Sequence, residues 1–226
     1  MPTFDALAEK YDLWFETSLG EYVANREKRL ILELAQPVRG EKMLDVGIGT
    51  GFFAIEFLKR GVEITGIDVS TKMLALAEKK GFKNISPGDA ADLHFPEESF
   101  DLVVSVTALE FIMDPRRAVS EMMRVCKKGG RVIVGTLGAD SPWAHKRRRD
   151  MKRNPASVFH EAHFYTFPEL RRIAGNFGSR ATFRGAVFAP PYDNALCVLA
   201  GKIIESPCQS LCPSRGAFLA FRLDKE

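Results

Sequence analysis

The chain has 226 residues, of which 46% are hydrophobic and 27% are charged, and its formal net charge is +3. This length is long for one domain and short for two, and the composition is ordinary for a globular protein that needs no disulfide or metal to hold its core. The small net charge does not by itself indicate nucleic acid binding, and no apolar segment approaches the roughly 20 residues that span a bilayer.

The expected compartment follows from the first residues and from the cysteines. Residues 1–5 lack the basic and apolar regions of a signal peptide. The four cysteines, Cys126, Cys197, Cys208 and Cys212, form no CxxC pair, and a reducing cytosol would keep them as thiols. We therefore expect a cytoplasmic protein.

The first half of the chain alternates between short apolar runs and helical patterns. Apolar positions at helical spacing predict helix over 5–35, and Pro37 and Gly40 end this pattern. Five strand-then-helix units then predict a doubly wound, mainly parallel α/β sheet. The expected strands are 42–46, 63–67, 84–87, 100–106 and 131–136, and the expected helices are 51–59, 71–80 and 114–126.

The C-terminal part departs from this alternation. Residues 167–177 have a helical pattern, whereas 181–188 and 217–223 have the pattern of strands with little helix between them. Two closing strands joined in this way are expected to be antiparallel. The chain has no internal repeat or clear linker, so we expect a single domain over 1–226.

A glycine-rich loop follows the first expected strand. Asp45 precedes Gly47, Gly49 and Gly51, and glycines here let the backbone turn tightly and let a ligand approach closely. A dinucleotide loop needs glycine where this chain has Phe52, and a P-loop needs a lysine that is missing. The remaining GxGxG pattern suits a ligand without a pyrophosphate, such as the aminoacyl end of S-adenosylmethionine (SAM).

Acidic residues also end the second and third strands. Asp68 follows the loop at about the 20-residue distance typical of a carboxylate that binds ribose hydroxyls. Asp89 follows the third strand, where its carboxylate or the neighbouring amide can read an adenine edge. Either acid alone is more often a turn or cap residue. Three successive strand ends with acids, after a GxGxG loop, favour a nucleoside ligand.

Several segments together resemble the class I SAM-dependent methyltransferases, in the branch similar to the ubiquinone/menaquinone-biosynthesis enzymes (methyltransferase type 11). The resemblance implies a Rossmann-like, seven-stranded sheet of order 3-2-1-4-5-7-6 with an antiparallel seventh strand. It also implies N-terminal cap helices over 1–36. The segments are 4–15 (FDALAEKYDLWF), 44–51 (LDVGIGTG), 66–70 (GIDVS), 88–105 (GDAADLHFPEESFDLVVS) and 121–135 (EMMRVCKKGGRVIVG).

The same resemblance implies a cofactor site. Gly47, Gly49 and Gly51 would lie against the methionine portion of SAM, with Asp45 at its amino group. Ile48 departs mildly from the family, which more often has a small residue here. The other implied contacts are Tyr11 at the carboxylate, Asp68 at the ribose, Val69 and Met73 on the adenine, Asp89 and Ala90 at its edge, and Thr107 near the sulfonium.

The catalytic residue is harder to predict. Methyl transfer is an in-line displacement that mainly needs alignment and exclusion of water, with a base only where the nucleophile begins protonated. The weak candidates are Glu110, after the fourth strand, and His163 and Tyr165, before the helix at 167; each also has an ordinary explanation as a surface or loop residue. His160 and His163 could ligate a metal, but no third ligand is evident, so we expect none.

Two further features have competing interpretations. Cys197 lies in a strand-like run over 195–200, and Cys208 and Cys212 lie in a proline-bearing loop that could grip a soft ligand. Their placement does not match the arsenite methyltransferases, which favours incidental cysteines. The basic run over 146–153 could attract an anionic substrate or RNA. It could equally be the solvated face of a substrate-side lid over 138–180, and it lacks the interleaved aromatics of a nucleic acid site.

The sequence thus predicts a cytoplasmic enzyme that transfers a methyl group from SAM to a small-molecule acceptor and leaves S-adenosylhomocysteine. The alternatives are a non-catalytic SAM-binding or sensing protein, and a methyltransferase that takes an anionic or RNA substrate through 146–153. A nicotinamide oxidoreductase is disfavoured by Phe52. Neither the acceptor nor the oligomeric state is predicted, because the fold and the cofactor loop are shared by enzymes with many acceptors.

Overall fold

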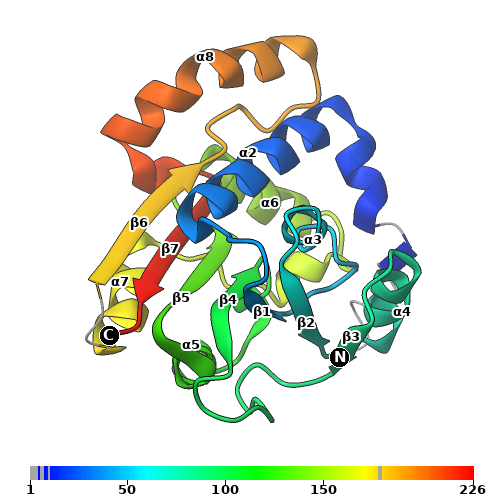
Figure 1. Ribbon diagram of the computed structural model, residues 1–226. Coiled ribbons are helices and arrows are strands. Elements are labelled where there is room, and N and C mark those ends of the chain that lie inside the picture. The colour runs from blue at the N-terminus through cyan, green and yellow to red at the C-terminus, as the bar shows by residue number, and fades with distance from the viewer. Residues whose placement is uncertain (1–4, 6–7, 10, 178–179) are drawn as a thin grey trace.

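The computed structural model describes residue 5, residues 8–9, residues 11–177 and residues 180–226. Phe4 and Leu7 of the expected N-terminal helix lie outside the described residues. One seven-stranded sheet has the order β3-β2-β1-β4-β5-β7-β6, in which β7 is antiparallel to both of its neighbours (Figure 1). This confirms the predicted sheet. The strands are β1 (Lys42–Val46), β2 (Glu63–Asp68), β3 (Asn84–Pro87), β4 (Phe100–Val106), β5 (Cys126–Leu137), β6 (Arg180–Ala186) and β7 (Phe218–Asp224).

The helices begin at residues that can cap them. The Ser70 side chain accepts a hydrogen bond from the Met73 amide at the start of α4, and Thr166 and Glu169 form a capping box at α7. The helices are α2 (Ser18–Ala35), α3 (Ile55–Leu58), α4 (Thr71–Lys79), α5 (Pro115–Val125), α6 (Pro142–Met151), α7 (Phe167–Ala174) and α8 (Ala195–Leu211), with short 3-10 turns η1 (Asp12–Glu16), η2 (Leu109–Phe111), η3 (Val158–His160), η4 (Gly175–Phe177) and η5 (Pro213–Arg215).

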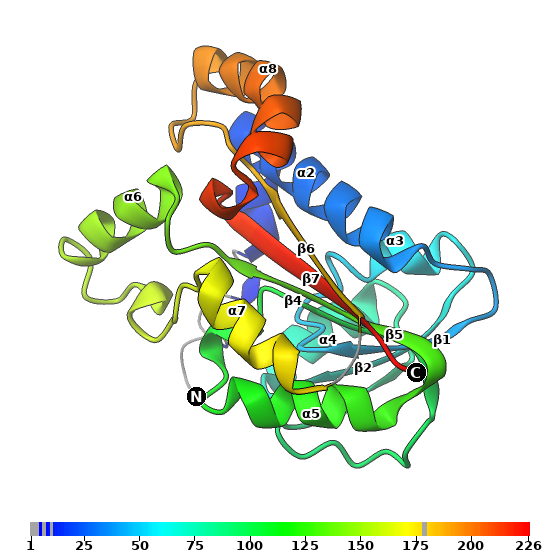
Figure 2. The ribbon, with the colours of Figure 1, turned by 90° about the vertical axis from the view of Figure 1, so that its left-hand side faces the viewer.

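Helices cover both faces of the sheet (Figure 2). One buried cluster packs α2, α3 and α4 on the first face, with Ile31, Phe57 and Phe218 among its fully buried side chains. A second cluster packs α5 and α7 on the other face around Met122 and Leu170. Because both faces are covered, the central strands are continuous apolar runs, which is why they could be predicted.

The prediction of little helix between the two closing strands is wrong. Residues 195–211 form α8, which packs on α2 and β6, carries Cys197 and Cys208, and ends just before Cys212 (Figure 1). Asn194 caps this helix by accepting a hydrogen bond from the Cys197 amide. A short apolar run does not distinguish a strand from a helix by periodicity alone.

A buried glutamate holds α8 to the rest of the protein. Glu205 is 2% exposed and accepts hydrogen bonds from the Tyr22 hydroxyl at 2.7 Å and from the amides of Val187 at 2.8 Å and Phe188 at 3.1 Å. The helix therefore packs through a polar contact, while Leu196 and Ile203 on it stay 78% and 66% exposed.

An arginine of β5 closes the C-terminal end of α2. The Arg131 guanidinium donates to the carbonyl oxygens of Ala35 and Gln36 and pairs with both carboxylate oxygens of Glu41 at 2.8 Å. The last carbonyls of a helix have no partner within the helix and carry partial negative charge, so a cation satisfies them. In the described part of the chain, no helix is both long and apolar enough to cross a membrane.

Candidate active site

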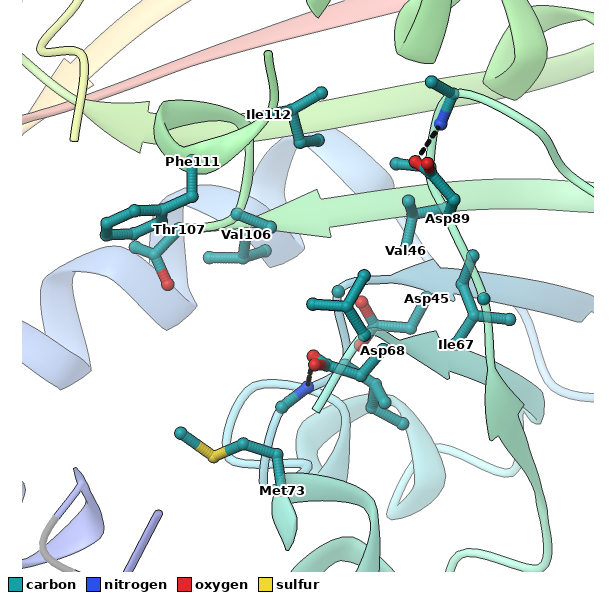
Figure 3. Close-up of a pocket in the computed structure, with 18 of the residues that line it drawn as sticks. Asp45, Val46, Ile67, Asp68, Met73, Asp89, Val106, Thr107, Phe111 and Ile112 are labelled. Carbon is teal, nitrogen blue, oxygen red and sulfur yellow. Dashed lines mark hydrogen bonds between the residues drawn. The ribbon is translucent and has the colours of Figure 1, made fainter. Parts of the chain in front are cut away.

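A cavity of about 320 Å³ opens where β1, β2 and β4 end (Figure 3). In open α/β sheets, ligands bind beyond the carboxyl ends of the strands. The lining contains ten of the predicted cofactor residues: Tyr11, Asp45, Gly47, Gly49, Asp68, Val69, Met73, Asp89, Ala90 and Thr107.

The loop after β1 is shaped by its glycines. Gly47 has φ of 80°, and a Cβ there would lie 2.5 Å from the Cβ of Ala108, so only glycine lets the β1 and β4 ends approach this closely. Gly49 has φ of 54°, and a Cβ there would have no protein atom within 4 Å. The loop therefore leaves space beside its backbone that a ligand can fill.

Asp68 joins this loop to the end of β2. Its Oδ2 accepts a hydrogen bond from the Gly49 amide and its Oδ1 accepts one from the Ser70 amide, both at 2.8 Å. Each carboxylate oxygen has a second lone pair, so Asp68 can still accept hydrogen bonds from ligand hydroxyls. Figure 3 shows this carboxylate and that of Asp45 near the centre of the cavity wall.

The charge of the wall suits a ligand with a cationic group. Burial, together with the negative charge of Asp68, raises the pKa of Asp45 to about 7. Burial also raises the pKa of Asp68. A cation beside these two groups would favour their ionised forms. The residues present thus fit SAM, which carries an ammonium, a sulfonium and ribose hydroxyls.

Apolar side chains also belong to the cavity wall. Val69 is 52% exposed and Met73 is buried, and both belong to the cavity wall. Asp89 lies on the opposite side from Thr107 in Figure 3, and its Oδ1 accepts a hydrogen bond from the Ala91 amide at 2.9 Å. Gly51, the remaining predicted cofactor residue, faces Phe82 instead, since a Cβ there would lie 2.3 Å from that ring.

Thr107 has an unusual backbone conformation at the end of β4. Its φ is 51°, in the left-handed region that β-branched residues rarely adopt. Such conformations cost about 1–3 kcal/mol and cluster at functional sites. Here the conformation brings the Thr107 hydroxyl to 3.4 Å from the Tyr11 hydroxyl, so two residues 96 positions apart meet on the cavity wall.

The structure brings the three catalytic candidates close together: the His163 amide donates to the Glu110 carbonyl at 2.7 Å, and the His163 and Tyr165 ring centres are 4.6 Å apart. Glu110 is 2% exposed, and its Oε2 accepts a hydrogen bond from the Thr136 hydroxyl at 2.9 Å. Tyr165 is also buried, and its hydroxyl donates to the Leu109 carbonyl at 3.2 Å. The His163 side chain is 58% exposed, with its Nε2 at 3.2 Å from an oxygen of Glu169. None of the three candidates is among the residues that line the cavity, and of the three only Glu110 and Tyr165 are buried.

Sequence reasoning missed two residues that lie near Glu110. Glu27 of α2 is 5% exposed, and burial raises its pKa to about 8. Arg147 of α6 belongs to the basic run, yet its Nη1 atom is buried, and its guanidinium lies 5.4 Å from the Trp143 ring centre and 5.2 Å from that of Phe159. Glu27 could have been recognised from the sequence, because it is a glutamate on the apolar face of α2. Nothing in the sequence distinguishes Arg147 from the other basic residues of its run.

The histidines and cysteines do not gather into a metal site. Across the residues that the structure describes, no group of three or more His, Cys, Asp or Glu side chains could hold a metal ion. Cys126, Cys197, Cys208 and Cys212 are free thiols.

Comparisons with known proteins identify the family. A methyltransferase-domain family model matches residues 44–134. The phosphatidylethanolamine N-methyltransferase of Cereibacter sphaeroides is 36% identical over 139 residues, which cover 58% of this chain and 67% of that protein. The demethylmenaquinone methyltransferase of Thermotoga maritima is 39% identical over 139 residues, which cover 59% of each chain.

A solved structure has the same fold over the whole chain. It is a SAM-dependent methyltransferase of Thermotoga maritima, described as a possible histamine N-methyltransferase. The TM-score is 0.78 at 24% sequence identity, with 100% of this chain and 99% of that chain covered. At this identity the likeness shows the fold alone.

The sheet order and the cavity beyond its central strands define a Rossmann-like fold with a ligand cavity at the carboxyl ends of its strands. The chain belongs to the class I SAM-dependent methyltransferases, in the type 11 branch that includes the demethylmenaquinone methyltransferases. As a member of this family, it is an enzyme with SAM as its cofactor.

Proposed function

We propose that the cavity binds SAM with its methionine end against Gly47 and Gly49 and its ribose at Asp68. The observation that carries this proposal is the hydrogen bond from the Gly49 amide to the Asp68 carboxylate. Beside it, Gly49 has no side chain, and the space that a Cβ would occupy is open. Asp45 would hold the ammonium group, since an ionised carboxylate there needs a cation partner. Bound SAM supplies an electrophilic methyl group at its sulfonium.

The remaining expected contacts complete this orientation. Val69 and Met73 would pack on the adenine, with Asp89 and Ala90 at its edge. Tyr11 and Thr107 would lie at the other end, near the carboxylate and the sulfonium. Gly51 would act through the shape of the loop, because its near neighbour is the Phe82 ring.

We also propose that the acceptor is a small molecule that reaches the Tyr11 and Thr107 end of the cavity. The whole chain would act as one methyltransferase domain, with residues 1–36 as a cap and residues 138–166 as the acceptor-side cover. Within the longer predicted lid, residues 167–174 pack into the core as α7. The partly buried Arg147 makes the basic run less suited to RNA. The four free thiols agree with a cytoplasmic location.

The relatives do not decide the acceptor. One relative is named as a phosphatidylethanolamine N-methyltransferase and another as a demethylmenaquinone methyltransferase, and the solved structure is described as a possible histamine N-methyltransferase. These acceptors differ in both size and charge. The acceptor has to be argued from the side chains of this chain.

The cofactor proposal is tested with Gly49→Ala, using Gly129→Ala as its matched control. Both glycines have positive φ, 54° and 74°, and at both an added Cβ would meet no protein atom within 4 Å. We expect similar small losses of melting temperature in both variants. Isothermal titration with SAM should show at least a tenfold loss of affinity for Gly49→Ala alone. Equal affinity in the two variants would argue against this placement of the cofactor.

A further inference from the structure

Two buried glutamates and a partly buried arginine from distant parts of the chain gather behind the Tyr11 and Thr107 end of the cavity. They are Glu27 of α2, Glu110 of η2 and Arg147 of α6. Each of the three interacts electrostatically with the other two. Glu27 and Glu110 also act on Tyr11, whose hydroxyl lies beside that of Thr107. We call Glu27, Glu110 and Arg147 the charged cluster.

The members of the charged cluster are not paired with one another. In the described part of the protein, Arg147 forms no ion pair within 4.0 Å, and its Nη1 atom is buried without a hydrogen-bond partner. Oε1 of Glu110 is likewise buried without a partner, although Oε2 is bound by Thr136. Buried polar atoms nearly always have partners in folded proteins. One donor and one acceptor are therefore available to a third group.

Aromatic side chains fix the position of the guanidinium. It lies over the rings of Trp143 and Phe159, and the Trp143 indole donates to the Ala189 carbonyl at 2.8 Å. The Trp14 ring meets Trp143 edge to face at 6.3 Å, so the N-terminal cap contributes to the same wall. These ring contacts hold the guanidinium in place, with its Nη1 atom buried.

We propose that the charged cluster is the acceptor subsite and that the acceptor is an amino-carboxylate, whose amino nitrogen receives the methyl group. Nη1 of Arg147 would donate to a carboxylate oxygen of the acceptor, and Oε1 of Glu110 would accept a hydrogen bond from its amino group. Glu27 would add a second acidic group near the ammonium. This inference rests on the proposed position of SAM, which sets the methyl group near Thr107.

The chemistry balances without any further reactant. Glu110, as a carboxylate, takes one proton from the ammonium group of the acceptor and leaves a neutral amine. The nitrogen lone pair then forms the new bond to the methyl carbon as the carbon–sulfur bond breaks and its electrons stay on sulfur. The products are S-adenosylhomocysteine and an N-methylammonium group, and Glu110 returns its proton to water as the product leaves.

The surroundings of Glu110 suit proton transfer near neutral pH. Burial raises its pKa to about 7, while a hydrogen bond from its own backbone amide, the Thr136 hydrogen bond and the charge of Arg147 act in the opposite direction. The other titratable groups that interact with it are Glu27 on α2, Tyr11 in the cap and Tyr165 before α7. A base with a pKa near the working pH is the most effective.

The acceptor class is tested by measuring S-adenosylhomocysteine release at saturating SAM. The panel contains the common α-amino acids, the amines that lack the carboxylate, the acids that lack the amino group, and phenols and quinols. We expect turnover with at least one amino acid, and at least tenfold lower kcat/KM for its decarboxylated amine. Turnover of phenols or quinols only, or of no compound by a protein that binds SAM, would overturn the proposal.

Variants then test the two unpaired atoms. Glu110→Gln should lower kcat by about 10²- to 10⁴-fold and remove the rise of kcat with pH near 7. Arg147→Gln should mainly raise KM for the amino acid. Arg149→Gln, at an exposed arginine of the same helix, is the matched control and should change neither.

Binding and stability measurements keep the outcomes separable. Each variant is first checked by thermal melting, and Glu27→Gln replaces Arg147→Gln if the latter fails to fold. All variants should bind SAM within about twofold of the original protein by titration. Loss of SAM binding in the unaltered protein would defeat the proposed cofactor site. Retained SAM binding with unchanged turnover in Glu110→Gln would defeat the acceptor subsite alone.

Discussion

The buried carboxyl group of Asp45 should make stability depend on pH in a way that asparagine at this position removes. Burial and the charge of Asp68 raise the pKa of Asp45 from 3.8 to about 7. The folded protein therefore binds more protons here than the unfolded chain does between about pH 4 and pH 7. Its free energy of unfolding falls as the pH rises through this window.

The magnitude follows from the same pKa difference. The rise from 3.8 to about 7 corresponds to about 4 kcal/mol, at about 1.4 kcal/mol for each tenfold change. This is an upper bound, because relaxation and water entry reduce the effect when Asp45 ionises. Asp45→Asn cannot ionise. Relative to the original protein, its free energy of unfolding should rise by up to about 3 kcal/mol between pH 5 and pH 8, since two of the roughly three pH units between the two pKa values lie in this range.

Urea unfolding at several pH values, without SAM, measures this directly. Asp140→Asn, at an exposed carboxylate, is the control and should follow the original protein at every pH. Titration with SAM should show the opposite effect, with weaker binding by Asp45→Asn above about pH 7, because the ammonium loses its ionised partner. The reasoning is refuted if the difference in unfolding free energy between the two proteins is the same at pH 5 and pH 8.

Two further predictions concern the polar contacts that hold the fold. Glu205→Gln should lower the free energy of unfolding by about 1–3 kcal/mol, because buried donors on Tyr22 and in the backbone lose a charged acceptor. The control Lys202→Gln, at an exposed residue of the same helix, should change it by less than about 0.5 kcal/mol. Equal urea midpoints for the two variants would contradict the role of Glu205. Arg131→Met should cost about 3 kcal/mol. Arg131 holds the pKa of Glu41 below its usual value. The loss of unfolding free energy caused by Arg131→Met should therefore shrink below about pH 4, where Glu41 becomes protonated. A loss that does not depend on pH would count against the ion pair.

The sequence was a good guide to the parallel half of the fold. The strands β1, β2 and β4 contain short apolar runs bounded by turn residues, and local sequence decides such elements. The helix α8 could not be recognised in this way because its pattern is inverted. Leu196 and Ile203 on it are exposed, while the residue that anchors it is the buried Glu205.

The residues of the site also divide into those that local sequence predicts and those that it does not. The position of the glycine loop and Asp68 on the cavity wall was predictable because it depends on spacing along one or two strand ends. The charged cluster was not, because Glu27, Glu110 and Arg147 meet only when α2, η2 and α6 are brought together. Ile48 is another example: a Cβ at Gly66 would lie 2.5 Å from its Cδ1, so the larger residue fits only because the neighbouring strand has glycine there.

The central claim is that Asp68 forms part of the cofactor site, and SAM titration of Asp68→Asn tests it most directly. Loss of the charged acceptor from the ribose should weaken binding by about 1–3 kcal/mol, which corresponds to about 5- to 150-fold in Kd. Asp140→Asn serves as the control, and thermal melting shows whether the loop held through Gly49 remains folded. The account predicts this loss for Asp68→Asn alone. A folded Asp68→Asn protein that binds SAM as tightly as the original would contradict it.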